Sequence, residues 1–331
     1  MASLRRIVAV CQMTSKNDKQ SNLKTCSELI KHAKERQAQM VFLPETCDFI
    51  GESKAEMLAS AEPPDGETMQ KFCQMAKDNQ VWLSVGGVLQ KVGEKVRNAH
   101  VIINSDGEVV SKYHKIHLFD VDIPEQNVRL MESEFSIPGD EITPPVETPV
   151  GKVGLSICYD MRFPEQSLTL TKMGADILAY PSAFTFTTGS AHWEPILRAR
   201  AIECQCYVIA AAQTGVHNKK RSSWGHAMIV DPWGAIIAQC SEGTGIATAE
   251  LDMSYLKQVR RNMPVWEHRR NDLYPALPSL DSNPKLVPYD QQQEYKFGHT
   301  SVKASGVFYK TDKTLAFTNL RCVAPGRILL K

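Results

Sequence analysis

The stretch KVGLSICYDMRFPEQSLTLTK, residues 152–172, decides the fold. Residues 152–158 are mostly apolar and predict a buried strand. A polar break follows, and Pro164 then opens a run with helical spacing, as prolines in the first turn of helices do. Cys158 therefore closes a strand, and functional side chains concentrate where the strands of α/β sheets end.

The same alternation of strands and helices continues on both sides of this stretch. It predicts a layered α/β domain in which helices cover a mixed sheet. The order strand, helix, strand, helix, strand, hairpin occurs twice, and two sheets stacked between two helix layers satisfy it. A Gly-Gly pair within one strand predicts a close approach of two backbones. The predicted strands cover residues 6–13, 40–43, 81–89, 152–158, 177–180, 207–213 and 246–251, the predicted helices cover 22–38, 68–78, 164–172 and 193–204, and the predicted hairpins cover 100–114 and 227–239.

The composition narrows the class of protein. The 331 residues carry 38 basic and 37 acidic side chains, a formal net charge of +1, which gives no reason to expect nucleic acid or a membrane as a partner. No apolar run reaches the roughly 18–20 residues of a membrane helix, and the N-terminus enters a strand without room for a secretory signal or a mitochondrial presequence. Nine scattered cysteines without a C-x-x-C pair are typical of a reducing compartment. We therefore expect a cytoplasmic protein.

The composition changes near residue 262. The residues that follow are polar and rich in proline, without clear periodicity, which predicts an extended linker. Residues 305–310 and 315–320 then predict a β-hairpin. A hairpin alone is at best marginally stable, so this segment either docks elsewhere or opens a further domain.

Three reactive side chains fall at or near predicted strand ends: Glu45, Lys115 and Cys158. Considered singly, each has an ordinary structural explanation. Glu45 fits a solvated loop carboxylate and Lys115 fits a surface lysine. Cys158 fits a small buried apolar residue, which is what most free cysteines are.

Together the three residues suffice for acyl transfer. A thiol that attacks an electrophilic carbon needs a base, and Glu45 can take this role if it is buried beside Lys115. The ammonium group of Lys115 and the backbone N–H of Tyr159 can stabilise the oxyanion. Glu45 can then protonate the departing amine and activate water against the thioester. Spacing alone leaves open whether the three residues meet.

Three segments resemble the signature segments of the nitrilase superfamily of carbon–nitrogen hydrolases: LPE (43–45), KYHKIHLFD (112–120) and GLSICYDMRFPE (154–165). The resemblance implies an α-β-β-α four-layer sandwich that self-associates as a dimer or tetramer. It also implies a small-molecule amide substrate and neither a cofactor nor a metal.

The resemblance implies a role for each reactive residue. Glu45 is the expected general base, Lys115 the oxyanion stabiliser and Cys158 the nucleophile. Glu132 matches a further glutamate that orients the lysine, and Tyr159 supports the site. The residues expected to line the substrate pocket are Ser182, Ala183, Phe184 and Thr185.

The segment after the cysteine resembles the amidase branch of the superfamily, because true nitrilases differ there. Within this branch it is most similar to the animal amidases that hydrolyse deaminated glutathione to 2-oxoglutarate and cysteinylglycine. Other ω-amides and carbamoyl compounds are the alternative substrates. Arg162 and Glu165 are expected to form an ion pair that braces the turn of the nucleophile.

Three C-terminal segments, YKFGHTSVKASGVFYKT (295–311), AFTN (316–319) and VAPG (323–326), resemble the opening of a fragile-histidine-triad domain. That family hydrolyses diadenosine polyphosphates, and invertebrates carry fusions of the two domains. This implies a hydrolase domain at 1–275, a linker at 276–294 and an incomplete histidine-triad fragment at 295–331. His299 is the last histidine and no H-x-H-x-H run occurs, so we do not expect dinucleotide hydrolysis from this chain. A function of another class, an oligomeric scaffold that presents the second domain, is the alternative.

Overall fold

The structure is a computed structural model that describes residues 5–126, 128–270 and 272–273, and five strands between residues 294 and 330. The chain divides into two compact units, Met1–Val265 and Trp266–Lys331. Within the described residues, none of the helices combines the length and the apolar character required for crossing a membrane.

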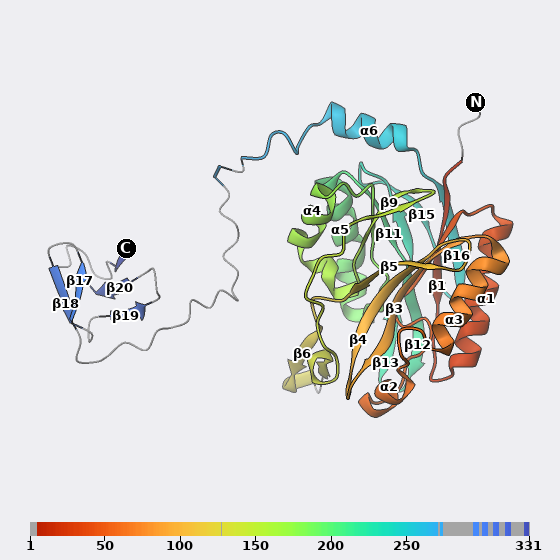
Figure 1. Cartoon of the computed structure of the whole chain (residues 1–331), viewed down its shortest axis with the longest axis horizontal. Helices are drawn as coiled ribbons and strands as arrows, with labels where there is room; N and C mark the ends of the chain where they lie inside the picture. The colour runs from red at the N-terminus through yellow and green to blue at the C-terminus, as the bar shows by residue number, and fades with distance from the viewer. Residues whose placement is uncertain are drawn as a thin grey trace. The chain divides into compact units, whose positions relative to one another are not determined.

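The first unit is built on two mixed sheets (Figure 1). The first sheet has the order β13-β12-β1-β2-β3-β4-β5, with β16 also paired to β1, and the second has the order β15-β14-β11-β10-β9-β8. The strands of the first sheet are β1 (Ile7–Met13), β2 (Met40–Leu43), β3 (Trp82–Val92), β4 (Lys95–Ile103), β5 (Val109–His114), β12 (Ala212–Asn218), β13 (Arg221–Trp224) and β16 (Gly245–Glu250). Those of the second are β8 (Val146–Thr148), β9 (Gly151–Leu155), β10 (Ile177–Ala179), β11 (Tyr207–Ala210), β14 (Met228–Val230) and β15 (Ile236–Gln239).

Helices cover the outer face of each sheet. In Figure 1, α1 and α3 lie on one side of the two sheets, and α4 and α5 lie on the other. This arrangement of two mixed sheets between helices confirms the predicted fold class. The helices are α1 (Lys19–Glu35), α2 (Lys54–Ser60), α3 (Glu67–Asn79), α4 (Pro164–Lys172), α5 (Phe186–Cys204) and α6 (Met253–Asn262), and a short hairpin is formed by β6 (Asp120–Ile123) and β7 (Val128–Met131).

The alternation of side chains along β1 separates the two apolar cores. Val8 and Val10 point into the core that contains the second sheet with its helices. Ala9 and Cys11 point to the opposite face, toward the core formed with α1 and α3. Because both faces of the strand are buried, its sequence is continuously apolar instead of alternating with polar residues.

The predicted strand at 207–213 is two strands that belong to different sheets. β11 pairs with β10 in the second sheet, whereas β12 pairs with β1 in the first. The chain crosses between the sheets at Ala211, whose carbonyl accepts a hydrogen bond from the amide of Ser182. A continuous apolar run cannot show this break, because burial in either sheet requires the same residue types.

Helix α5 begins at Phe186, earlier than the predicted residue 193. The side chain of Thr185 accepts a hydrogen bond from the amide of Thr188 and caps the helix. This capping interaction, common at helix starts, fixes the first turn although the sequence there lacks a clear apolar stripe.

The second unit contains two small antiparallel arrangements. β17 (Glu294–Phe297) pairs with β18 (Thr300–Lys303), and β19 (Val307–Lys310) pairs with β20 (Leu315–Thr318), to which β21 (Ile328–Leu330) is added. The predicted hairpin at 305–320 is therefore present in its strands. The predicted linker at 276–294 lies outside the described residues except for Glu294, which begins β17.

The Gly-Gly pair of β3 forms a bulge in the first sheet. The pairing of β3 with β4 shifts between Val85 and Val88, so that Gly86 and Gly87 oppose a single residue of β4. A Cβ atom on Gly86 would lie 2.0 Å from the Cβ of Pro181, and one on Gly87 would lie 2.5 Å from the Cγ of Glu45. The close approach predicted from these glycines is confirmed, and it brings β3 against two segments of the site described below.

We expect Gly86→Ala to destabilise the protein, because the added methyl group must displace Pro181 or the carbonyl of Leu43. Overpacking of this kind costs about 1–3 kcal/mol. Urea denaturation measures the difference in the free energy of unfolding. Gly245→Ala is the matched control, since nothing lies within 4 Å of its added Cβ. Equal stability of the two variants would contradict the proposed contact.

Candidate active site

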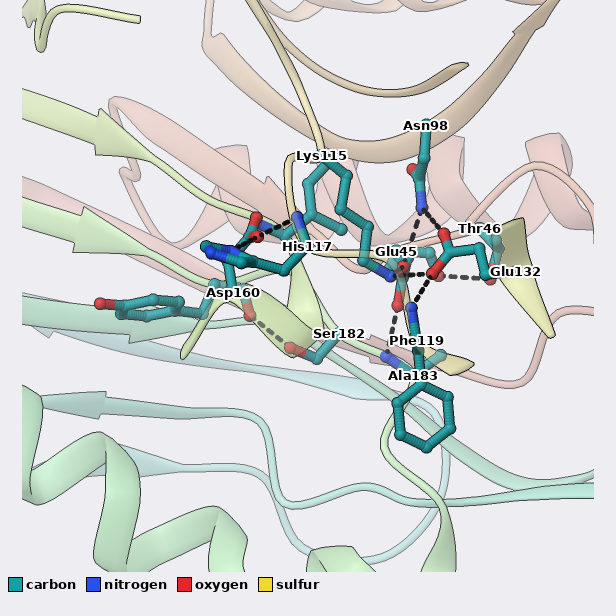
Figure 2. A network of polar contacts seen from close by, with 12 residues as sticks. Glu45, Thr46, Asn98, Lys115, His117, Phe119, Glu132, Asp160, Ser182 and Ala183 are labelled. Atoms are coloured by element: carbon teal, nitrogen blue, oxygen red, sulfur yellow. Dashed lines mark hydrogen bonds and ion pairs between the residues drawn. The ribbon is translucent and has the colours of Figure 1, made fainter. Parts of the chain in front are cut away.

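The ends of four strands bring the predicted site residues together. Glu45 follows β2, Lys115 follows β5, Cys158 follows β9, and Ala183 follows β10. The first two strands belong to one sheet and the last two to the other. The site is therefore assembled across the two sheets, and Figure 2 shows the polar contacts around Glu45.

Glu45 is the centre of this network. Its Oε1 atom accepts hydrogen bonds from Lys115 Nζ at 3.2 Å and from Asn98 Nδ2 at 2.9 Å, and its Oε2 atom accepts one from the amide of Ala183 at 3.1 Å. Burial raises the pKa of Glu45, whereas the charge of Lys115 and the interaction with Cys158 lower it. The lowering effects are the larger, so the pKa of Glu45 lies below the ordinary 4.5. The carboxyl group is therefore ionised at neutral pH.

Lys115 lies between two carboxylates. Its Nζ atom donates to Glu132 Oε2 at 2.8 Å as well as to Glu45, and the side chain is only 3 % exposed. Burial lowers the pKa of Lys115, but the charges of Glu132 and Glu45 raise it well above the ordinary 10.5. Glu132 also accepts a hydrogen bond from the amide of Phe119 at 2.8 Å, so it fixes the segment after Lys115.

Cys158 lies on a sharp turn from strand to helix. It opens a 3₁₀-helix (Cys158–Arg162) with a backbone φ of 47°, a left-handed value that is uncommon for residues other than glycine. Its amide donates to the carbonyl of Pro181 at 2.9 Å, which holds the turn against the end of β10. Non-glycine residues held in this region are concentrated at functional sites.

The Cys158 thiol is protonated in the resting site. Burial, and after it the charge of Glu45, raise the pKa of Cys158 well above the ordinary 9.0, although Lys115 acts in the opposite direction. Cys158 and the Glu45 carboxylate shift each other's pKa, so Glu45 is the group that can take the proton of the thiol. The pair is thus a thiol with its base and not a preformed thiolate.

Asp160 anchors the turn of the nucleophile, and sequence reasoning did not single it out. Its Oδ2 atom accepts hydrogen bonds from the amide of Ile157 and from the hydroxyl of Tyr113, each at 2.8 Å. Its Oδ1 atom lies 2.8 Å from His117 Nδ1. Because Tyr113 and His117 flank Lys115, Asp160 ties the segment of the lysine to that of the cysteine.

Asn98 and Gln213 also escaped sequence reasoning. Asn98, on β4, contacts both Glu45 and, at 3.4 Å, Glu132. Gln213, on β12, donates to the backbone carbonyls of Glu45 at 3.0 Å and Thr46 at 3.2 Å. A lone amide side chain within a strand carries no motif that distinguishes it, so only the pairing of the strands reveals these roles.

The four residues expected to line the pocket have different surroundings. Ala183 contacts Glu45 through its amide. Ser182 is fully buried and its hydroxyl donates to the carbonyl of Tyr180, so it contributes its backbone to this region. Phe184 packs on Trp193 with ring centroids 5.2 Å apart. Thr185 is occupied in capping α5.

The residues after the cysteine pack as an aromatic cluster. The ring of Tyr159 makes edge contacts with Phe119 at 5.0 Å and Phe163 at 5.3 Å. Within the described residues Arg162 forms no ion pair with Glu165, so that expectation is wrong. The side chain of Arg162 turns toward α5 instead. Its Nη1 atom lies 3.3 Å from Nδ1 of His192, and its guanidinium group lies over the Phe184 ring.

This geometry can move a proton between Cys158 and Glu45 beside a fixed positive charge. The three side chains lie in a region with little water, where such charges act strongly. Cys158 keeps 9 % of its surface exposed, against 5 % for Glu45 and 3 % for Lys115. The arrangement is suited to attack of a thiol on a carbonyl carbon.

Comparison with known proteins points to the same chemistry. The sequence profile of the carbon–nitrogen hydrolase family matches residues 7–261. The chain is 50 % identical over 333 residues to the nitrilase and fragile histidine triad fusion protein NitFhit of Caenorhabditis elegans, covering 100 % of this chain and 74 % of that protein. It is 52 % identical over 276 residues to the deaminated glutathione amidase of Homo sapiens, covering 82 % of this chain and 84 % of that protein.

Structural comparison agrees with the sequence comparison. The crystal structure of the C. elegans NitFhit protein superposes with a TM-score of 0.78 at 47 % identity, covering 100 % of this chain and 79 % of that chain. The family profile and these relatives confirm the resemblance seen in the three signature segments. The chain belongs to the carbon–nitrogen hydrolase family.

Proposed function

We propose that this protein is an amidase in which Cys158 is the nucleophile, Glu45 the general base and Lys115 the oxyanion stabiliser. The observation that carries the proposal is that one buried carboxylate, Glu45, hydrogen-bonds to the Lys115 ammonium group at 3.2 Å and is close enough to Cys158 for the two groups to shift each other's pKa. Membership of the carbon–nitrogen hydrolase family supports it.

In the first half-reaction, the thiol attacks the carbonyl carbon of the substrate amide while its proton passes to Glu45. The negative charge that develops on the carbonyl oxygen is stabilised by Lys115 and by the amide of Tyr159. Tyr159 is the second residue of its helix, a position where backbone N–H groups have no partner within the helix. Glu45 then gives the proton to the departing amine nitrogen as the C–N bond breaks, leaving a thioester on Cys158.

In the second half-reaction, Glu45 takes a proton from water, and the hydroxide attacks the thioester carbonyl carbon. The C–S bond breaks, the thiolate recovers the proton from Glu45, and the acid product leaves. Glu132 holds Lys115 in place through both steps. The amine and the acid are released in turn, and the enzyme returns to its starting protonation state.

The proposed substrate is deaminated glutathione, which would give cysteinylglycine as the amine and 2-oxoglutarate as the acid. The support is the 52 % identity to deaminated glutathione amidases of mammals over 276 residues. Other ω-amides or carbamoyl compounds remain the second candidates, and a panel of substrates separates them by kcat/KM.

We further propose that residues 1–275 form the hydrolase domain and residues 295–331 the beginning of a histidine-triad domain, joined by 276–294. The match of the C. elegans fusion protein to 100 % of this chain supports this division. Diadenosine polyphosphate hydrolysis would require an H-x-H-x-H run, which this sequence does not contain.

Cys158→Ala tests the nucleophile. We expect no release of cysteinylglycine from deaminated glutathione, because alanine cannot form the thioester. Liquid chromatography measures the dipeptide, and the thermal unfolding midpoint verifies the fold. Cys73→Ala, at a half-buried cysteine of α3, is the matched control and should retain activity. Dipeptide release by Cys158→Ala at the wild-type rate would refute the mechanism.

The pH dependence of kcat/KM tests the base. Activity requires ionised Glu45 and is lost as the pH falls through its pKa, which lies below 4.5. We therefore expect this acidic limb below pH 4.5 and no loss through Glu45 at higher pH. Glu45→Gln should lower kcat by about 10²–10⁴-fold, the usual contribution of a general base.

Glu28→Gln, at an exposed glutamate of α1, is the control for the loss of one carboxylate and should leave kcat unchanged. Circular dichroism at each pH separates unfolding from titration. An acidic limb centred well above pH 4.5 in the folded wild-type enzyme would contradict the proposed state of Glu45.

We also propose that the chain self-associates as a dimer or tetramer. An exposed apolar pair supports this: Ile202 of α5 is 51 % exposed, Trp233 is 55 % exposed, and Ile202 lies against Gly234, the neighbour of Trp233. Exposed apolar groups that lie together are typical of interaction surfaces.

Sedimentation velocity should give at least twice the chain mass of 37.0 kDa, and Trp233→Glu should lower it. Val216→Glu, at another exposed apolar residue, is the control and should not change the mass. A wild-type protein that sediments as a monomer would contradict both the self-association and a scaffold function.

A further inference from the structure

One basic segment, Lys219-Lys220-Arg221, has no role in the mechanism derived above. Lys219 and Lys220 are exposed in the turn between β12 and β13, whereas Arg221 is half-buried and begins β13. Arg221 pairs across the hairpin with Asn218. The three cations therefore differ: two lie in solvent, and one is built into the sheet.

The strand that begins at Arg221 is attached to the segment that contacts Glu45. The amide of Trp224 donates to the carbonyl of Phe184 at 3.0 Å, and Ser223 forms an antiparallel bridge with Thr185. Ala183, one residue before Phe184, donates its amide to Glu45. Arg221 is thus held by backbone pairing at a fixed position relative to the active site.

Arg221 lies on the face of the hairpin that is turned toward Glu45. Residues two apart in a strand share a face, as do residues paired across a hairpin, so Arg221 lies on the face of Ser223 and its partner Gly215. Gln213, two residues before Gly215, lies on this face and donates to the backbone carbonyl of Glu45. The charge of Arg221 reaches the Glu45 carboxylate and lowers its pKa.

The neighbouring histidine does not supply this charge. His217 Nε2 lies 2.8 Å from Ser223 Oγ. Burial lowers the pKa of His217 to about 4, and the charge of Arg221 also lowers it, although the contact with the Ser15 carbonyl acts in the opposite direction. His217 is therefore neutral at pH 7. Two cations act on this histidine: Arg221, and Lys16, whose Nζ donates to the backbone carbonyls of Val216 and His217.

In the described part of the chain, no carboxylate forms an ion pair with Arg221. Among the ion pairs of the described residues none includes it, and the Glu45 carboxylate already contacts Lys115. Two other half-buried or buried arginines do have acidic partners, Glu203 for Arg200 at 2.6 Å and Asp176 for Arg260 at 3.6 Å, whereas Arg97 and Arg162, like Arg221, form no ion pair within the described residues. The guanidinium group of Arg221 sits on a strand whose backbone is fixed relative to the active site, its charge reaches Glu45, and it forms no ion pair, so it is available to bind an anion from outside the chain.

We propose that Arg221 binds a carboxylate of the substrate and selects anionic amides over neutral ones. A guanidinium group presents two parallel N–H donors that match the two oxygens of a carboxylate, which fixes the orientation of the ligand as well as its charge. The inference rests on the amidase function proposed above. Deaminated glutathione offers two such groups, the carboxylate of its 2-oxo acid and that of its glycine.

The test combines variants with altered substrates. The substrates are deaminated glutathione, its methyl ester at the 2-oxo acid, and its glycinamide form, so that each analogue lacks one carboxylate. The variants are Arg221→Gln, Arg221→Lys and the control Lys219→Gln, which removes an exposed cation of the same turn. The quantity compared is the ratio of kcat/KM between the parent substrate and each analogue, measured for every variant.

We expect Arg221→Gln to lower kcat/KM for deaminated glutathione by about 10–100-fold, the usual effect of losing a charged hydrogen bond, mainly through KM. For the analogue that lacks the recognised carboxylate, wild type and Arg221→Gln should be equal, which identifies the carboxylate. Arg221→Lys should retain part of the selectivity. Lys219→Gln should behave as wild type.

An equal loss with all three substrates would overturn the proposal, because Arg221 would then act only through its charge on Glu45. The same loss in Lys219→Gln would also overturn it, since general attraction of anions would suffice. Either result leaves the amidase function intact. A wild-type enzyme that cleaves none of the three substrates would instead overturn the proposed function, and the inference with it.

Discussion

An ionised carboxylate without access to bulk water is the constraint on which this site depends. Removing a carboxylate from water costs several kcal/mol unless charges and hydrogen bonds replace the lost hydration. For Glu45 the replacements come from the ammonium group of Lys115, the side-chain amide of Asn98 and the backbone amide of Ala183. These donors belong to segments of both sheets, so the charge of one residue requires the two sheets to be aligned.

The same constraint explains the backbone around the site. Thr46, directly after Glu45, has a φ of 55° and donates its amide to the carbonyl of Gly87, which itself has a φ of 69°. Cys158 has a φ of 47° on the other sheet. Such conformations cost free energy and persist only where the surroundings determine them. Here the determining contacts are the Pro181 carbonyl and the Asp160 carboxylate, which hold the turn of the nucleophile from two sides.

The sequence was sufficient to locate Glu45, Lys115 and Cys158 near predicted strand ends, because apolar runs that end abruptly mark those positions. It also indicated the two-sheet fold, through the repeated order of strands and helices. It could not show that residues 207–213 pass from one sheet to the other, since both sheets bury the same residue types. Asn98, Asp160 and Gln213 were missed for a related reason: their importance arises from contacts between segments that are distant in the sequence.

The protonated state of Cys158 affects how fast the thiol reacts with oxidants and electrophiles. Peroxide and simple alkylating agents react with thiolates, and their rates follow the thiolate fraction. Because burial, and after it the neighbouring carboxylate, keep the sulfur protonated, that fraction is small, and electrophiles that do not bind the site react with it slowly. Only a compound that places an electrophilic carbon against the sulfur, and so draws the proton onto Glu45, reacts readily. The cysteine thereby combines resistance to oxidants with reactivity toward the molecules that fit.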